Sequence, residues 1–326
     1  MIKIKLLPNI DIKATYECNA QCKHCLFACS PKRSGGYMTD ETAKDICQIL
    51  QKANFKSVHI GGGEVFLDFN SLTKLVEIVL DSGLTITRVE TNGFWAANEE
   101  RAIDYIRNLK LMGVDGLQVS LDPFHMQYIP IALPLRLAEL CKLENFPCYL
   151  HKEKYARYFL SEFDPTKTHS LEELEQKISK DFVKELIRSY GIIPSGRAVA
   201  LEHKYGELRP VKELAGCKPC KALLSSGNYR IDVYKKLVPM GCTGIALPLQ
   251  EAIEGIPEGK YPVFETLFNG GTIVLLEYAQ KLGFVPLADG YTSECAMCFH
   301  TRHWLCKNHP NSHPELFLEH YEESLG

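Results

Sequence analysis

The stretch IDIKATYECNAQCKHC, residues 10–25, decides the fold class of this chain. Its first six residues alternate apolar and polar side chains and predict a short strand, which leads directly into Cys18, Cys22 and Cys25. Three thiols at this spacing can wrap around one iron–sulfur cluster, because such clusters are held by cysteine thiolates. Three ligands on a four-iron cube would leave one iron open. The alternative is a zinc ion, for which Cys29 or His24 would supply the fourth ligand.

Strand-like and helix-like segments alternate through the next hundred residues. Repeated β-α units of this kind predict a parallel sheet with its chemistry at the carboxyl ends of the strands. The predicted strands lie at 55–60, 84–89 and 117–121, and the predicted helices at 39–53, 71–81 and 98–111. Farther along, the pattern predicts helices at 131–141 and 170–190 and a last barrel strand with its loop within 192–201.

Composition excludes several classes of protein. The net charge is −3, from 37 Lys and Arg against 40 Asp and Glu, which argues against nucleic-acid binding through bulk positive charge. The sequence contains no apolar run long enough for a membrane span, and residues 1–5 resemble a strand more than a secretory signal. Without an export signal, we expect a cytoplasmic protein whose 13 cysteines are reduced and available to metals or clusters.

The cysteine motif, together with the run Gly61-Gly62-Gly63-Glu64 after the second predicted strand, resembles the radical S-adenosylmethionine (SAM) family. The resemblance implies an α/β fold, a partial (β/α)6 TIM-like barrel over residues 1–210. It also implies a [4Fe-4S] cluster on Cys18, Cys22 and Cys25 whose open iron binds SAM. An electron from a flavodoxin- or ferredoxin-type donor then cleaves SAM to a 5′-deoxyadenosyl radical, which abstracts hydrogen from the substrate.

The resemblance also implies a set of SAM contacts. They are His24, Gly62, Gly63, Glu64, Thr91, Asn92, Ser120, Asp122 and Arg197. Among them, Glu64 would hold the methionine ammonium and Arg197 the carboxylate, as a fork. Ser120 and Asp122 suit the ribose hydroxyls, and His24 suits the adenine. Each has a structural alternative: Glu64 as a carboxylate favoured at a helix start, Arg197 as a surface residue, and the others as turn or loop residues.

A second group of cysteines lies near the C-terminus. It comprises Cys217, Cys220, Cys242, Cys295, Cys298 and Cys306. A predicted hairpin around Lys235-Lys236 would bring Cys242 back beside Cys217 and Cys220. The pattern resembles the auxiliary-cluster extension, of SPASM or twitch type, in radical SAM enzymes. It implies a small cysteine-rich α+β domain over 211–326 with at least one auxiliary iron–sulfur cluster. The rival is a zinc site on Cys295, Cys298, Cys306 and His309.

Residues 18–31, 62–68 and 92–95 are similar to radical SAM peptide epimerases, which use a cysteine as hydrogen donor. The resemblance departs at Pro239-Met240-Gly241-Cys242, which has one cysteine where those enzymes have an adjacent pair; Cys29, Cys220 or Cys306 could then be the donor. We assign no catalytic residue. The substrate hypotheses are a peptide, which leads, and a small metabolite. A non-catalytic zinc-binding module is the third hypothesis. No nucleic-acid or membrane partner is expected, and the oligomeric state stays open.

Overall fold

An eight-stranded sheet organises the molecule in this computed structural model, which describes residues 1–33, 35–214, 218–224 and 229–321. The strand order is β5-β4-β3-β2-β1-β6-β7-β8; β1 to β6 run parallel, and β7 and β8 are antiparallel to their neighbours. The strands are β1 (Asn9–Lys13), β2 (Ser57–Gly61), β3 (Thr85–Thr91), β4 (Leu117–Ser120), β5 (Cys148–His151), β6 (Tyr229–Ile231), β7 (Lys236–Pro239) and β8 (Leu247–Pro248). The predicted α/β class is confirmed.

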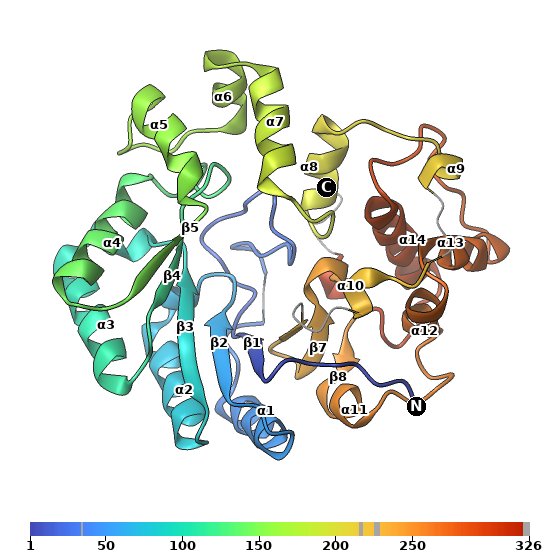
Figure 1. Cartoon of the computed structure of the whole chain (residues 1–326), viewed down its shortest axis with the longest axis horizontal. Helices are drawn as coiled ribbons and strands as arrows, with labels where there is room; N and C mark the ends of the chain where they lie inside the picture. The colour runs from blue at the N-terminus through green and yellow to red at the C-terminus, as the bar shows by residue number, and fades with distance from the viewer. Residues whose placement is uncertain (34, 215–217, 225–228, 322–326) are drawn as a thin grey trace.

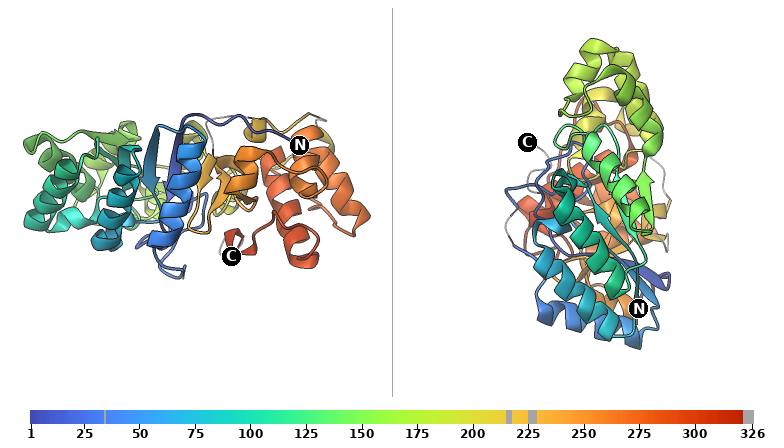
Figure 2. Two further views of the ribbon diagram at one scale, coloured as in Figure 1. Left: turned by 90° about the horizontal axis from the view of Figure 1, so that it is seen from below. Right: turned by 90° about the vertical axis from the view of Figure 1, so that its left-hand side faces the viewer.

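Helices pack beside the parallel strands and gather again beyond β8 (Figures 1 and 2). The larger helices are α1 (Asp40–Lys52), α2 (Phe69–Asp81), α3 (Glu99–Met112), α4 (Ala132–Leu143), α7 (Lys180–Tyr190), α8 (Ala198–Tyr205), α12 (Pro262–Asn269), α13 (Thr272–Lys281) and α14 (Glu294–Asn308). The short ones are α5 (Ala156–Glu162), α6 (Leu171–Lys177), α9 (Val211–Leu214), α10 (Lys221–Leu224), α11 (Leu249–Glu254), and the 3-10 turns η1 (Val65–Leu67), η2 (Phe94–Ala97), η3 (Glu153–Tyr155), η4 (Met240–Cys242) and η5 (Leu318–His320). Within the described ranges, no helix combines the length and apolarity that crossing a bilayer requires.

The first 125 residues fold close to their predicted pattern because local signals and packing agree. The Thr39 hydroxyl caps α1 by accepting the Thr42 N–H, and Asn98 caps α3 in the same way. Gly113 ends α3 with a left-handed backbone (φ +96°) that glycine adopts without strain. The apolar residues of β1 and β2 pack with those of α1 and α2 in one core.

Three elements differ from the prediction. The expected helix at 170–190 is divided into α6 and α7, because the Ser179 hydroxyl caps a new helix by accepting the Phe182 N–H. The strand expected within 192–201 was wrong: a turn leads there into α8. The sixth parallel strand is instead β6, which pairs with β1 on the side away from β2. Strand β5, at the edge beyond β4, was not predicted.

The predicted hairpin near Lys235 is confirmed. Strands β6 and β7 pair antiparallel from Tyr229 with Pro239 to Ile231 with Leu237. The predicted domain boundary near residue 210 falls between α8 and α9, and the strands beyond it extend the same sheet through the pairing of β6 with β1. Figure 1 places the C-terminal helices α12 to α14 on the far side of β8 from β1.

Charged side chains on one face of the sheet join four parallel strands. Arg230 of β6 forms ion pairs with Asp11 of β1 (3.2 Å) and Glu90 of β3 (3.5 Å), and His59 of β2 lies 3.3 Å from Asp11 and 3.4 Å from Glu90. Burial alone would raise the pKa of Glu90, but the charge on Arg230 reverses this and holds it below its usual value. Arg230 is therefore the cation that fastens β6 to the earlier strands.

We expect Arg230→Met to lower the free energy of unfolding by about 1–3 kcal/mol, because it leaves two partly buried carboxylates without their counter-charge. Urea denaturation of wild type and variant at the same cluster content would measure the difference. Arg107→Met is the matched control, since it breaks a surface pair with Glu144 and should change stability little. Equal stability of wild type and Arg230→Met would contradict this role of the network.

Candidate functional site

The first cysteine loop follows β1 and lies at the carboxyl end of the parallel strands. Cys18 and Cys22 are buried, and Cys25 is partly exposed. Backbone amides point at the sulfurs: Ala20 N–H donates to Cys18 Sγ and Cys29 N–H to Cys25 Sγ, both at 3.4 Å. A hydrogen bond from the Cys29 thiol lowers the pKa of Cys25 well below its usual range. A set of thiols supported by amide donors fits the iron–sulfur cluster that the sequence predicts.

Arg197 holds this loop in shape. Its Nε donates to the carbonyl of Cys22 at 3.1 Å and its Nη2 to that of Cys29 at 2.5 Å, while its backbone N–H donates to the carbonyl of Cys25 at 3.1 Å. Three carbonyls of the loop are thus fixed by one residue from the turn before α8. Its contact with the SAM carboxylate stays a prediction.

The glycine run after β2 packs directly against the segment that leads to Cys18. Gly63 N–H donates to the Thr15 carbonyl at 2.7 Å, and Glu64 N–H donates to the Glu17 carbonyl at 2.9 Å. A Cβ at position 63 would lie 2.0 Å from the Glu17 carbonyl oxygen, so only glycine allows this approach. Gly62 is also tightly packed, but less so, since its Cβ would lie 3.0 Å from the Thr15 carbonyl oxygen. The glycines therefore bring Glu64 beside the cysteine loop.

Glu64 is buried, and its carboxylate joins the ends of β2 and β3. One oxygen accepts from the Thr91 hydroxyl (2.9 Å) and the Phe66 N–H (3.1 Å), and the other accepts from the Asn92 N–H (2.7 Å). The Asn92 side chain in turn donates to Asn19 in the cysteine loop at 2.8 Å. Burial raises the pKa of Glu64 to about 7 despite these donors. Its role with the SAM ammonium stays a prediction.

Asp122 lies after β4 with both carboxylate oxygens occupied. One oxygen accepts from the N–H groups of Phe124 (2.9 Å) and His125 (3.0 Å); the other contacts His125 Nδ1 (2.8 Å) and accepts from the Tyr190 hydroxyl (3.0 Å). Burial would raise the pKa of Asp122, but the neighbouring His125 lowers it overall, so the carboxylate stays ionised. Ser120 shares the wall of a small cavity with Asp122. Their contact with ribose stays a prediction.

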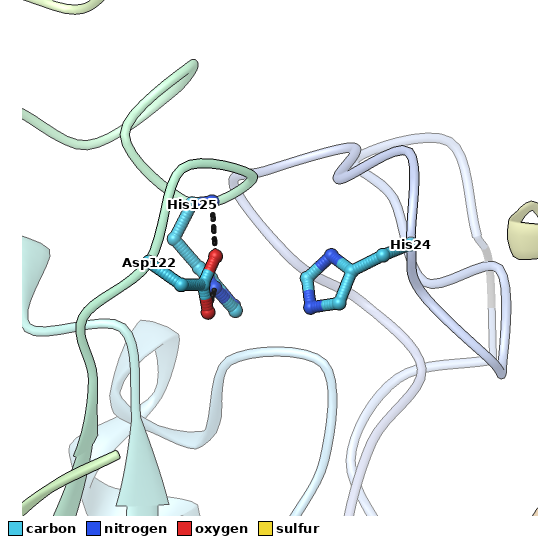
Figure 3. A group of neighbouring side chains, drawn as sticks. All are labelled: His24, Asp122 and His125. Atoms are coloured by element: carbon cyan, nitrogen blue, oxygen red, sulfur yellow. Dashed lines mark hydrogen bonds and ion pairs between the residues drawn. The ribbon is translucent and has the colours of Figure 1, made fainter. Parts of the chain in front are cut away.

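His24 faces this pair from the cysteine loop (Figure 3). One ligand atom from each of His24, Asp122 and His125 lies within 4.8 Å of the others. The His24 ring stacks on Phe124 at 4.5 Å between centroids, and burial lowers its pKa to about 4, so the imidazole is neutral at pH 7. A neutral ring next to an ionised carboxylate and a flat aromatic suits the predicted adenine contact, which stays a prediction.

A second group of thiols is formed by Cys220, Cys242, Cys295 and Cys298. Cys220 precedes α10, Cys242 ends η4, and the other two lie in the first turns of α14. A hydrogen bond from the Cys242 thiol lowers the pKa of Cys220 to about 6, whereas burial, followed by the charges of Cys298 and Cys220, raises the pKa of Cys295. The donor set of four thiols fits the predicted auxiliary cluster. Cys217 lies outside the described residues.

The geometry of α14 rules out the alternative zinc site. Cys295 and His309 are 14 residues apart, so they lie about 21 Å apart along a helix that rises 1.5 Å per residue. Four ligands of one zinc ion lie within a few Å of each other, because each is about 2.0–2.3 Å from the metal. Cys306 lies about 12 Å along the helix from Cys298 by the same rise and next to Tyr321. The structure therefore separates Cys306 from the four thiols.

Sequence reasoning missed His125, Tyr190 and Arg302. His125 had a local signal, since it stands three residues after Asp122 in a turn. Tyr190 had none, because it reaches Asp122 from the end of α7. Arg302 is buried in α14, where its Nε donates to Cys298 Sγ at 3.4 Å. Its spacing of four residues from Cys298, one helical turn, was the available signal.

Comparison with known proteins agrees with this geometry. Residues 12–131 match the family model of the radical SAM superfamily. This segment, which carries the first cysteine loop and the ends of β1 to β4, is therefore a radical SAM domain.

Two curated proteins and one solved structure are similar to the chain. The putative peptide biosynthesis protein YydG of Bacillus subtilis is 27% identical over 121 residues, 37% of this chain and 38% of its own. The putative glycyl-radical enzyme activating enzyme MJ1632 of Methanocaldococcus jannaschii is 32% identical over 81 residues, 25% and 30% of the two chains. The aligned regions thus span well under half of either relative. The structure of BtrN with AdoMet and 2-DOIA aligns over 82% of this chain and 90% of its own, at 14% identity and a TM-score of 0.46.

The raised pKa of Glu64 gives a pH-dependent contribution to stability. The folded protein holds this proton more tightly than the unfolded chain, whose glutamate has its ordinary pKa of 4.5. The contribution is therefore complete below pH 4.5 and is lost as pH rises through 7, by about 3 kcal/mol in total. We expect the difference in unfolding free energy between cluster-free wild type and Glu64→Gln to fall over this window. Denaturant titrations at several pH values would measure it, and a constant difference would contradict the prediction.

Proposed function

We propose that this chain is a radical SAM enzyme that removes a hydrogen atom from a peptide substrate. The observation that carries the proposal is the cysteine loop of the radical SAM domain, with the three thiols Cys18, Cys22 and Cys25 beside the buried carboxylate of Glu64. When bound, a [4Fe-4S] cluster on these thiols supplies the electron that cleaves SAM to methionine and a 5′-deoxyadenosyl radical.

The chain's own residues prepare this site. Arg197 and the glycine run fix the loop, so that the thiols are positioned before any cofactor arrives. The pKa of Glu64 is about 7, so both of its protonation states are accessible near neutral pH. The ammonium group of bound SAM would favour the ionised form. Asp122, held by four contacts, keeps His125 oriented near Cys22. Buried surroundings of this kind exclude water from a reactive radical.

The peptide substrate rests on the similarity to YydG, whose name assigns it to peptide biosynthesis. The reaction on the peptide is epimerisation, a crosslink or another rearrangement.

The proposal includes an auxiliary iron–sulfur cluster on Cys220, Cys242, Cys295 and Cys298. Cys242 then acts as a ligand, so a hydrogen donor would have to be a different thiol, such as Cys29 or Cys306. A flavodoxin- or ferredoxin-type protein would supply electrons, in a cytoplasm that keeps the thiols reduced.

We expect Cys22→Ala to abolish the formation of 5′-deoxyadenosine, because a cube held by two thiols is not retained. The test is anaerobic reconstitution with iron and sulfide, reduction with dithionite in the presence of SAM, and chromatography of the products. Cys47→Ala is the matched control, since Cys47 is a buried core residue of α1 and should leave SAM cleavage intact. If Cys22→Ala cleaved SAM at the wild-type rate, the result would contradict the proposed function.

The substrate class is tested with candidate peptides encoded beside the gene. Incubation in deuterated water followed by mass spectrometry distinguishes the outcomes. A peptide that gains one deuterium without other change is expected for epimerisation, because a thiol hydrogen exchanges with solvent before transfer. A peptide that loses two hydrogens is expected for oxidation or a crosslink. Turnover of small metabolites with no change in any peptide would overturn the peptide assignment.

A further inference from the structure

Arg302 is a fully buried cation in the middle of α14. Its exposed fraction is 1%, and it is among the largest side chains in the molecule to be buried so completely. A guanidinium group cannot lose its proton in a protein, so the positive charge is permanent. Burying such a charge is strongly unfavourable unless an anion or several hydrogen-bond acceptors surround it.

The contacts of Arg302 hold no carboxylate among the residues that the structure describes. Nε donates to Cys298 Sγ at 3.4 Å, and Nη1 donates to the Thr243 carbonyl at 2.8 Å and the Tyr321 hydroxyl at 3.0 Å. Burial raises the pKa of Tyr321, so the phenol is neutral. The rings of Phe299 and Tyr321 add weak cation–π contacts at 5.5 and 5.8 Å. Besides the neutral Tyr321, the acidic groups that act most strongly on the guanidinium among the described residues are the thiols of Cys298 and Cys242.

All four thiols of the second group lie around this charge. The charge of Arg302 acts to lower the pKa of Cys220, Cys242, Cys295 and Cys298, although these residues come from three separate segments of the chain, and it acts in the same direction on Cys306, one turn farther along α14. Among the residues that the structure describes, four protonated thiols would leave the guanidinium without a counter-ion. Four thiolates on an iron–sulfur cluster would carry net negative charge at the right place.

The same side chain connects the second group of thiols to the first cysteine loop. Thr243, whose carbonyl accepts from Arg302, donates its hydroxyl to the Leu26 carbonyl at 2.8 Å. Leu26 directly follows Cys25. Ser195 supports the link, since its Oγ accepts the Thr243 N–H at 3.1 Å, and both residues are fully buried. Arg302 therefore has a fixed position relative to both cysteine sites.

We infer that Arg302 is the built-in counter-charge of an auxiliary iron–sulfur cluster bound by Cys220, Cys242, Cys295 and Cys298, and that it raises the reduction potential of this cluster. The inference rests on the auxiliary cluster of the proposed function and adds the residue that tunes it. The physical reason is that reduction makes the cluster more negative, so a buried positive charge and a hydrogen bond to a ligating sulfur favour the reduced form. Arg302 is a positioning residue, since it acts through the cluster and does not react.

The test uses the full chain with Cys18, Cys22 and Cys25 all changed to alanine, so that only the second site binds iron. Iron and sulfide are measured after reconstitution, and a redox titration followed by electron paramagnetic resonance gives the midpoint potential. We expect Arg302→Met in this background to bind less iron and sulfide and to shift the midpoint potential of the remaining cluster to a lower value. Arg302→Lys, which keeps the charge, should restore most of both.

Lys307→Met is the matched control, because it removes one positive charge from an exposed position of the same helix. It should leave the midpoint potential unchanged. The potential is read only from molecules that have folded and bound the cluster, so partial misfolding of Arg302→Met does not imitate the effect. A potential equal to that of the parent in Arg302→Met, or a shift of the same size in Lys307→Met, would overturn the role of Arg302. Absence of iron in the parent itself would overturn the auxiliary cluster, whereas the first site is tested separately, by SAM cleavage in the chain that keeps Cys18, Cys22 and Cys25.

Discussion

The contact between the glycine run after β2 and the backbone that follows β1 is the constraint on which the site depends. Gly63 lies so close to the Glu17 carbonyl that a methyl group has no room, and the Glu64 N–H donates to that same carbonyl. This contact puts a buried carboxylate next to the first cysteine. Thr91 and Asn92 then bond to the carboxylate, so the ends of β2 and β3 are joined to the loop. The absence of a side chain at Gly63 therefore allows the ends of β1, β2 and β3 to lie together.

Sequence patterns predicted the fold best where short-range signals and packing coincide. In residues 9–121, each strand ends in polar or glycine residues and each helix has a capping side chain, so the elements appear near their predicted positions. The strand expected within 192–201 failed because Pro194 and Gly196 break the extended backbone and Arg197 turns toward the cysteine loop. Strand β5 was missed because four residues of mixed polarity have little periodicity; its pairing with β4 makes it a strand.

The parts of the candidate site that depend on the spacing of residues along the sequence could be predicted. The positions of Cys18, Cys22 and Cys25 follow from their local spacing after a strand, and the hairpin that brings Cys242 back to Cys220 follows from alternation. Roles that depend on long-range contacts could not be read in this way. The hydrogen bonds of Arg197 to the loop carbonyls and the contact of Asp122 with His125 are of this kind, whereas the predicted SAM contacts of both residues stay predictions. The spacing of Arg302 from Cys298 is visible in the sequence, but the role inferred for Arg302 depends on thiols from three segments, which only the fold brings together.

The pairing of β6 with β1 has a consequence for how the chain is made. During synthesis, β1 and the four strands that follow it emerge first, and β1 presents one bare edge until residues 229–231 leave the ribosome. A bare edge exposes unpaired N–H and C=O groups that invite association with other chains. Asp11, which later pairs with Arg230, places a charge on that edge in the meantime. A charged side chain on an unpaired edge strand disfavours such association.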